Sequence, residues 1–518
     1  MLESLGDILR DNAYKLGDET AIVHDGRRIT FGEHFARSQR LASALHRAGL
    51  RRQDRIAVLS KNSERYLEIY GAAQLAGLVV GTVNFRLAAA EIGYIVADCA
   101  PRALFFEAEF APALASLRAS FPTVQHYVCI GARPDADASL EYEALLGSGC
   151  AEGAPVRARM DDVMHLIYTS GTTGRPKGVI RTHRAEMRIA EFMTTEVGVL
   201  REDVVQIMMP LYHVGARWLQ LGSHLRGARV VLHREFDPLE ILQTIERERV
   251  TVVHMAPTII QRVLDHPRID DFDVTSLRTI YYSAAPMPLP LLRRGLAKLG
   301  SVFLQAYGMT EGWGTTLHKG QHKPDGTPEE VKRLASVGQA SPGVGLRIVD
   351  DDGTPRPPGA PGEVELHTDT RMSGYWNNSI ATSAALQDGW YKSGDVGYLD
   401  DHGYLYLVDR KKDMIISGGE NIYCREVEEA IASHDDVADV AVIGVTDADW
   451  GEAVRAIVVV KAGAQLSDVQ VIEHCRSRIA SYKKPRSVVF VQELPRLTTG
   501  KVNKVLLRER YGGAKRAG

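Results

Sequence analysis

Short apolar runs alternate with longer amphipathic stretches over most of the chain. Between about residues 55 and 410 the runs have strand length and the stretches between them have helix length. This alternation is typical of strand–helix–strand units, and we predict a large N-terminal domain of layered α/β subdomains. The interval Arg133–Pro155 shows no clear periodicity and predicts a surface connection. The apolar runs are Ile56–Leu59, Leu104–Phe106, Ile207–Met209, Val230–Leu232, Val252–Met255 and Val302–Leu304.

The pattern changes after residue 340. Prolines and glycines come close together there, and Glu363–Leu366 alternates polar and apolar residues, which predicts short antiparallel strands and turns. A charge cluster at Asp409–Asp413 lies between two apolar runs and indicates a domain boundary. We therefore predict an N-terminal domain over 1–409 that ends in a short β-rich subdomain, and a small C-terminal α+β domain over 410–518, joined by a hinge.

The composition is that of a folded chain. Its 518 residues suggest about three domains or subdomains, and 45% hydrophobic with 25% charged residues is an ordinary balance. No run of 18 apolar residues occurs, so we expect no integral membrane segment. Met1–Arg10 carries acidic residues and lacks a basic region before an apolar core, which predicts an amphipathic helix and a cytoplasmic protein.

Charge and cysteine usage narrow the choice of partners. A net charge of −3 gives no field that would attract nucleic acid, so we expect no nucleic-acid partner. The cysteines are odd in number, widely spaced and without a C-x-x-C pair, which argues against a disulfide framework or a zinc site. Whether the protein forms a homodimer is left open by the sequence. The cysteines are Cys99, Cys129, Cys150, Cys424 and Cys475.

The stretch Tyr168–Gly178 is the richest in chemistry. It follows the apolar run Leu166–Tyr168 and holds glycines, hydroxyl side chains and one lysine, Lys177. Glycines let backbone N–H groups approach phosphoryl oxygens, hydroxyls donate to them, and the lysine adds a positive charge. Pro176 precedes the lysine and Gly178 follows it, so the Walker pattern is absent. The stretch predicts a nucleotide-binding loop outside the ordinary P-loop class.

Three further segments carry candidate ligands. Gln305–Glu311 follows a strand-like run, and there Tyr307 can stack on a base, Thr310 can donate to phosphate and Glu311 can bind Mg²⁺. Asp395, which we expect after a tight turn, can accept from both hydroxyls of a ribose. A loop near the C-terminus presents a single lysine, Lys501.

In this order and spacing, these segments resemble the adenylate-forming superfamily of acyl-CoA synthetases, adenylation domains and beetle luciferases, over essentially the whole chain. Asp409–Ile422, Trp450–Glu452 and Lys484–Arg486 look like segments of bacterial fatty- and aryl-acid CoA synthetases. The resemblance implies a ligase that uses ATP and Mg²⁺ to convert a small carboxylic acid to an acyl-adenylate. It then transfers the acyl group to CoA and releases AMP and pyrophosphate.

The resemblance also implies site residues. Magnesium would bind Glu311 beside Thr310, Lys501 would contact the carboxylate and the α-phosphate, and Lys412 would be the hinge. The residues implied at the β- and γ-phosphates are Thr169, Ser170, Gly171, Thr172, Thr173, Gly174 and Lys177. Those implied at adenine are Ser283, Ala284, Ala285, Pro286, Tyr307 and Gly308, at ribose Asp395 and Arg410, and at the CoA tunnel Gly418, Gly419 and Trp450.

The acid pocket is predicted from the same resemblance. It would be lined by His213, Val214, Arg217 and Trp218, by Met255–Ile259, and by Trp313–Thr316. No aspartate lies within Tyr212–Trp218 to pair with an α-ammonium group, which disfavours amino acids and favours a fatty or aryl monocarboxylic acid. Arg217, one helical turn after His213, is either a solvent-paired arginine or a ligand for a second carboxylate. A dicarboxylic acid as substrate and a carrier-protein pantetheine as acceptor stay open as alternatives.

Overall fold

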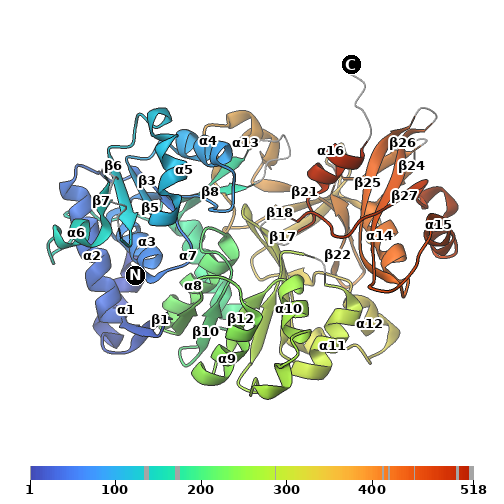
Figure 1. Ribbon diagram of the computed structural model, residues 1–518, viewed down its shortest axis with the longest axis horizontal. Coiled ribbons are helices and arrows are strands. Elements are labelled where there is room, and N and C mark those ends of the chain that lie inside the picture. Colours follow the sequence, from blue (N-terminus) through green and yellow to red (C-terminus); the bar gives the residue numbers. More distant parts are fainter. Residues whose placement is uncertain are drawn as a thin grey trace. The chain divides into compact units, whose positions relative to one another are not determined.

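The protein folds into two compact units. The computed structural model describes residues 2–132, 139–169, 176–285, 287–410, 413–417, 420–447, 450–496 and 501–512. Unit 1 comprises Met1–Gly345 with His367–Tyr391, and unit 2 comprises Leu346–Leu366 with Lys392–Gly518 (Figure 1). The predicted class, a large layered α/β portion followed by a small α+β portion, is confirmed. The domain boundary at residues 409 and 410 stays a prediction.

One sheet of unit 1 has the strand order β16-β15-β14-β13-β12-β10-β11-β1-β2. The strands from β1 through β14 in this order run parallel, and β2, β15 and β16 add to the edges in the antiparallel sense. The inner strands are buried throughout, as expected for a parallel sheet covered on both faces. The bounds are β1 (Thr20–His24), β2 (Arg27–Thr30), β10 (Val204–Ile207), β11 (Arg229–Leu232), β12 (Val252–Met255), β13 (Thr279–Tyr282), β14 (Phe303–Met309), β15 (Gly312–Leu317) and β16 (Gln339–Ala340).

The second sheet of unit 1 has the order β19-β9-β8-β4-β3-β5-β6-β7. Strand β9 folds back antiparallel on β8, and β19, which comes almost two hundred residues later in the chain, pairs antiparallel with β9. This late strand brings its side chains beside Lys177. The bounds are β3 (Arg55–Leu59), β4 (Val79–Thr82), β5 (Ala103–Glu107), β6 (His126–Ile130), β7 (Leu140–Glu141), β8 (Val163–Thr169), β9 (Lys177–Thr182) and β19 (Gly374–Tyr375).

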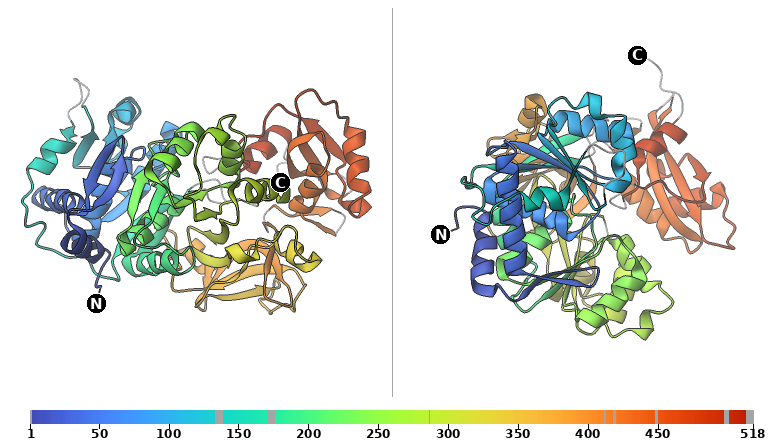
Figure 2. Two further views of the ribbon diagram at one scale, coloured as in Figure 1. Left: turned by 90° about the horizontal axis from the view of Figure 1, so that it is seen from below. Right: turned by 60° about the vertical axis from the view of Figure 1, so that its left-hand side comes forward.

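Helices fill the space between these two sheets and cover their outer faces (Figures 1 and 2). One core cluster joins α1, α2, α3, α7 and α8 to strands of both sheets. A second cluster packs α9, α10 and α11 on the far face of the first sheet, and a third packs α4 and α5 on the far face of the second. The bounds are α1 (Gly6–Leu16), α2 (Phe31–Arg47), α3 (Glu64–Ala76), α4 (Ala89–Cys99), α5 (Ala111–Ala115), α6 (Tyr142–Gly147), α7 (His183–Thr195), α8 (Val214–Arg226), α9 (Pro238–Glu248), α10 (Pro257–Leu264), α11 (Leu289–Leu299), α12 (Pro328–Arg333) and α13 (Ser379–Ala385).

Local signals start several of these helices. The Thr30 hydroxyl accepts from the Glu33 N–H while the Glu33 carboxylate accepts from the Thr30 N–H, a capping box that begins α2. Thr182 caps α7 and Asp237 caps α9, where Pro238 follows at the first position. None of the helices in the described ranges is both long enough and apolar enough to cross a membrane.

Unit 2 holds strands β17, β18, β22 and most of β21, and a further sheet of order β24-β23-β26-β25 with β27 beside β26, whereas β20 pairs with the start of β21 within unit 1. Helices α14 and α15 pack on one face of this further sheet, and α16 packs against a separate core cluster on β25 and β26. The bounds are β17 (Gly345–Val349), β18 (Gly362–His367), β20 (Leu386–Gln387), β21 (Trp390–Leu399), β22 (Leu405–Arg410), β23 (Ile415–Ser417), β24 (Glu420–Ile422), β25 (Val437–Asp447), β26 (Gly451–Val460), β27 (Ser487–Phe490), α14 (Cys424–Ala432), α15 (Asp468–Arg476) and α16 (Lys504–Tyr511).

Two local predictions were wrong. The interval after Arg133 is not only a surface connection, because α6 lies within it and buries Tyr142 and Leu145 against the core. Asp395 does not follow a tight turn. It lies inside β21, directly after Gly394, whose φ of +71° bends the strand locally.

Buried histidines make the fold sensitive to acid. Burial lowers the pKa of His34, His183, His254 and His322 to about 4, from an ordinary value of 6.5. Because the pKa of each histidine is lower in the folded state than in the unfolded state, its contribution to the free energy of unfolding is fully present above pH 6.5. This contribution is lost as the pH falls toward 4. At pH 5 each such histidine costs about 2 kcal/mol of unfolding free energy.

We therefore expect the urea midpoint of unfolding to fall clearly between pH 7 and pH 5. The variant His34→Gln, which stays neutral, should reduce this pH dependence. An unfolding free energy that is the same at both pH values would contradict the prediction.

Candidate nucleotide and acid site

Lys177 begins β9, where the β8–β9 hairpin returns from the predicted phosphate loop. Thr169 and Lys177 are cross-strand partners at the base of this loop. The Lys177 ammonium lies 4.9 Å from the centroid of the Tyr375 ring, a cation–π distance. The predicted loop residues Ser170, Gly171, Thr172, Thr173 and Gly174 lie outside the described residues.

Thr310 and Glu311 form the turn between β14 and β15. The Tyr375 hydroxyl donates a hydrogen bond of 2.9 Å to Glu311 Oε1. Burial and the nearby Glu311 charge raise the pKa of the Tyr375 hydroxyl well above its usual range, so the hydroxyl keeps its proton and donates. Tyr375 thus joins Lys177 to Glu311, two residues that lie more than a hundred positions apart in the sequence.

The predicted adenine segments end two neighbouring parallel strands. β13 pairs with β14 in the register Tyr282–Gln305, so Ser283 and Tyr307 lie toward the same edge of the sheet. Ala284 has a φ of +75°, a left-handed conformation that costs a non-glycine residue roughly 1 kcal/mol. A side chain at Gly308 would lie 2.9 Å from the Gly312 carbonyl oxygen, which explains the glycine there. Ala285 follows in the described chain, and Pro286 lies outside it.

Four aromatic rings form a column beside this edge. Phe192, Trp313, Tyr281 and His254 stack in that order, with centroid separations of 6.1, 6.1 and 4.3 Å and interplanar angles of 27° or less. The Trp218 ring lies 6.4 Å from the Trp313 ring. His254 Nε2 and the Ser283 hydroxyl are 2.8 Å apart, so the column reaches the predicted adenine segment.

Helix α8 presents its predicted acid-pocket residues in different directions. His213 is the N-cap, with its ring 4.5 Å from that of Tyr212, and Val214 begins the helix. A side chain on Gly215 would lie 2.6 Å from the His254 ring, so this face of α8 meets the aromatic column.

Arg217 lies elsewhere, fully buried, with its guanidinium 4.1 Å from the Tyr70 ring of α3 and an Nη donating to Gln220. Burial lowers the pKa of Arg217 to about 10, which leaves it protonated at neutral pH. Its second-carboxylate role stays a prediction.

The remaining predicted residues belong to unit 2. The main chains of Asp395 and Arg410 pair across β21 and β22, and Asp395 is buried. Trp450 is 45% exposed, with the Arg486 guanidinium 4.6 Å from its ring, and Lys501 is exposed. Lys412, Gly418 and Gly419 lie outside the described residues.

Comparison with known proteins decides the family. The sequence profile described as AMP-binding enzyme matches residues 9–376, and the profile described as AMP-binding enzyme C-terminal domain matches residues 426–501. The chain belongs to the AMP-binding enzymes.

Similar proteins agree with this assignment along nearly the whole chain. A feruloyl-CoA synthase from an Amycolatopsis species is 37% identical, over 95% of this chain and 96% of its own. A long-chain-fatty-acid–CoA ligase from Mycobacterium tuberculosis is 36% identical, over 98% and 99%. ATP-bound MatB from Rhodopseudomonas palustris, known from a crystal structure, is 30% identical in sequence to this chain. The two structures superpose over 99% of each chain with a TM-score of 0.88.

These findings confirm the expected superfamily and reaction class. This AMP-binding enzyme is an acid–thiol ligase of the acyl-CoA synthetase group, which activates a fatty or aryl acid with ATP to an acyl-adenylate and transfers it to CoA. ATP and CoA are its co-substrates.

The residues around Glu311 fit a magnesium ion that arrives on the nucleotide. Magnesium binds oxygen ligands and commonly takes only one or two from protein carboxylates, the others coming from phosphate and water. Glu311 offers a carboxylate and Thr310 a hydroxyl, while no group of three or more metal-ligating side chains occurs among the residues that the structure describes.

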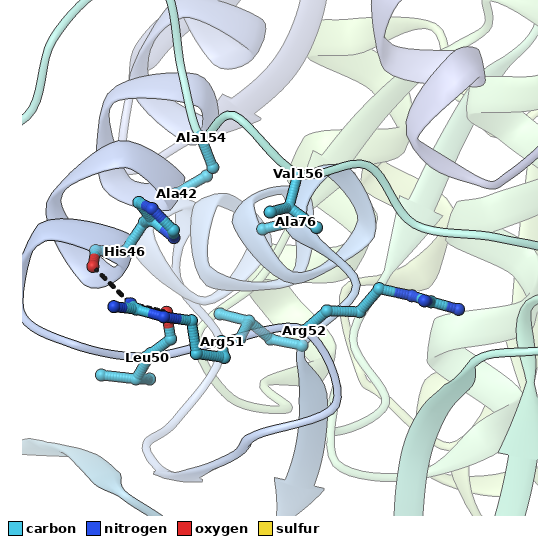
Figure 3. A pocket seen from close by; sticks show the side chains of 9 residues that line it. Ala42, His46, Leu50, Arg51, Arg52, Ala76, Ala154 and Val156 are labelled. Atoms are coloured by element: carbon cyan, nitrogen blue, oxygen red, sulfur yellow. Dashed lines mark hydrogen bonds between the residues drawn. The ribbon is translucent and has the colours of Figure 1, made fainter.

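Two hollows on unit 1 lie away from these residues. One, lined by α2, the end of α3 and the 154–156 segment, has a volume of about 10 Å³, too small for a nucleotide or an acid (Figure 3). The other, of about 270 Å³, is lined by β1, β2, β11 and α9, and its polar groups contact one another, Arg28 with Glu248 and the His233 ring with Glu240. The lining residues of these two hollows do not indicate a ligand.

Sequence reasoning missed Tyr375. The residue sits in an Arg-Met-Ser-Gly-Tyr-Trp segment without a recognisable motif, and only its pairing with Val179 on β9 places it at the site. The glycine before it, Gly374, was the one feature of the sequence that could have drawn attention to Tyr375. In the structure Gly374 has a φ of +148°, a conformation in which a side chain would be strained.

Proposed function

We propose that the acid activated by this enzyme is an aryl monocarboxylic acid. The observation that carries the proposal is the column of Phe192, Trp313, Tyr281 and His254, which stands beside α8 where the acid pocket is predicted. Flat aromatic walls favour offset or edge contacts with a planar ring. The rings are also bulky and buried, so they occupy volume that a long alkyl chain would need.

The chemistry assigned to the residues is charge stabilisation. A carboxylate oxygen attacks the α-phosphorus of ATP, the bond to the bridging oxygen breaks, and pyrophosphate leaves with its electron pair. Lys177 and Lys501 offset the negative charge that develops during this step, and backbone N–H groups of the 169–177 stretch bind the phosphates. Magnesium on Glu311 would neutralise charge on the phosphate oxygens when it is bound.

Residues of unit 2 complete the proposal. Asp395 and Arg410 bind the ribose, and rotation about Lys412 withdraws Lys501 after adenylation. Gly418, Gly419 and Trp450 then line the path of the pantetheine arm, whose thiolate attacks the acyl carbon and displaces AMP. A cytoplasmic location and a homodimer also remain predictions, to be checked by cell fractionation and light scattering.

The test is a product survey. The enzyme, Mg-ATP and CoA are incubated with pooled aryl, fatty and dicarboxylic acids, and acyl-CoA is identified by mass spectrometry. We expect aryl-CoA products at the highest rates. A preference for long-chain fatty or dicarboxylic acids would overturn the aryl assignment, and pyrophosphate release without any thioester would indicate a carrier-protein acceptor.

Removing one ring of the column should change the size preference. Trp313 is almost fully buried, and its indole N–H donates to the Ser341 hydroxyl at 2.9 Å. We expect Trp313→Ala to lower kcat/KM for a single-ring acid about tenfold and to raise it for longer acids, because the cavity costs packing but admits more substrate.

The control for this change is Phe303→Leu, which reduces a buried ring on β14 that belongs to the opposite core cluster. It should lower stability without changing the ranking of acids. An unchanged ranking in Trp313→Ala would contradict a role of the column in acid selection.

A further inference from the structure

We propose that the buried ion pair of Arg181 and Glu186 is a positioning pair for adenylation, which holds the main chain at Glu311 and so fixes the carboxylate of that residue. The inference rests on the proposed function, because it assigns the pair to the step in which Glu311 acts. Both would act through protein neighbours, Arg181 through the main chain of Glu311 and Glu186 through Arg181.

The contacts of Arg181 lead directly to the candidate magnesium ligand. Its Nε donates 2.7 Å to Glu186 Oε1, and one Nη donates to the carbonyl oxygens of Thr370 and, at 3.5 Å, Glu311. The Glu311 carbonyl also accepts from the Met372 N–H at 2.7 Å, and the Thr370 hydroxyl accepts from the Trp313 N–H at 3.0 Å. One guanidinium therefore ties the β14–β15 turn to the segment that leads into β19.

The register of β9 explains why this arginine and Lys177 serve the same site. Alternate residues of a strand point to one face, so Lys177, Val179 and Arg181 share a face of β9. Tyr375 pairs with Val179 in the middle of that face. Tyr375 thus holds the side chain of Glu311, with Lys177 beside the Tyr375 ring, while Arg181 contacts the Glu311 main chain.

Stability alone does not account for the pair. Both side chains are 0% exposed, and desolvating two charges costs about as much as their attraction returns, so apolar residues of similar size would serve at least as well in a purely structural role. The feature that apolar residues could not supply is the pair of hydrogen bonds to the two carbonyl oxygens.

Glu186 is held in turn by neighbours on other elements. Its Oε1 accepts from the Trp218 indole N–H at 3.4 Å, and its Oε2 lies 3.7 Å from His165 Nδ1 on β8. Burial keeps the pKa of His165 well below its usual range, so this histidine is neutral and Arg181 is the ionic partner within hydrogen-bond distance. The carboxylate therefore holds the Arg181 guanidinium by a direct hydrogen bond, whereas the buried Arg217 guanidinium interacts with it only electrostatically.

The experiment replaces both charges at once with Arg181→Leu/Glu186→Leu, since a single substitution would leave one charge buried. Three quantities are measured: Mn²⁺ affinity by EPR with a non-hydrolysable ATP analogue, pyrophosphate exchange with an aryl acid, and thioester formation from a pre-made acyl-adenylate and CoA. We expect the Mn²⁺ Kd to rise about tenfold and exchange to slow at least tenfold, with thioester formation from the adenylate unchanged.

The matched control is Arg347→Leu/Glu365→Leu, which removes a pair between β17 and β18 whose glutamate is equally buried. It should leave Mn²⁺ affinity unchanged. If Arg181→Leu/Glu186→Leu does not fold, Arg181→Lys replaces it, because one ammonium can keep Glu186 paired but cannot hold both carbonyls, and its Mn²⁺ Kd should rise severalfold.

The outcomes separate the two proposals. Wild-type Mn²⁺ affinity in folded Arg181→Leu/Glu186→Leu or Arg181→Lys would overturn the positioning role, even if the melting temperature falls. Failure of the wild-type enzyme to make an aryl adenylate would overturn the proposed substrate. The Mn²⁺ affinity measured with the ATP analogue would still test the positioning role of Arg181 and Glu186, because it does not depend on the acid.

Discussion

Replacing Lys501 with alanine should abolish adenylation while sparing the second half-reaction. We expect pyrophosphate exchange to fall by a factor of about 10³, because the variant loses a positive charge at the position where charge develops on the α-phosphate. Conversion of a synthetic acyl-adenylate and CoA to thioester should stay within about twofold of wild type, since the proposed rotation withdraws the lysine before that step. Rapid-quench assays of the two half-reactions measure both rates.

A nearby lysine offers a matched control for this variant. Lys504 begins α16, three residues later, and its ammonium lies 2.8 Å from Glu428 within unit 2. Lys504→Ala should leave pyrophosphate exchange nearly unchanged. Equal losses of both half-reactions in Lys501→Ala would contradict the division of labour and would place the lysine in both steps.

The second large effect is expected at Glu311. Glu311→Gln keeps the shape and can still accept from the Tyr375 hydroxyl, but it removes the negative charge that suits a divalent cation. We expect the apparent magnesium requirement to rise by about one order of magnitude and kcat for adenylation to fall about a hundredfold. Titration of initial rates against free Mg²⁺ at fixed ATP measures the first quantity.

Glu329, in the first turn of α12, provides the control. Glu329→Gln makes the same chemical change in unit 1, away from the β14–β15 turn, and should leave the magnesium titration unchanged. A Glu311→Gln enzyme with the wild-type magnesium dependence would remove Glu311 from the proposed metal site.

Much of the layered fold could be predicted from the apolar runs, because parallel strands covered on both faces must be apolar along their whole length. Val230–Leu232 and Val252–Met255 are such runs, and both are buried strands at nearly the predicted positions. The predicted strand at Ile207–Met209 begins too late in the sequence, because β10 begins at Val204 and includes the polar Gln206. Gln206 is fully buried and bonds to His233, a tertiary contact that local hydropathy cannot register.

Candidate site residues could be proposed where their chemistry is local in sequence. Lys177 and Glu311 stand in segments whose composition alone indicates phosphate and metal binding, but their link through Tyr375 depends on β19 pairing with β9. Arg181 and Glu186 could not be found either, because an arginine in a short strand normally indicates a solvent-facing position. The aromatic column likewise joins residues of α7, β12, β13 and β15 that no single segment contains.

The division of the chain into units has a consequence for its synthesis. The segment His367–Tyr391 belongs to unit 1, although Leu346–Leu366 just before it belongs to unit 2. Unit 1 therefore cannot close its second sheet while the ribosome is still translating the codons before residue 374, since β19 has not yet been made. Because domains fold largely as units during translation, the nascent chain carries β9 as an uncovered sheet edge for about two hundred residues of elongation. The hydroxyl that anchors Glu311 emerges at the end of that interval, so the β14–β15 turn, where we propose that magnesium binds, is among the last parts of unit 1 to be completed.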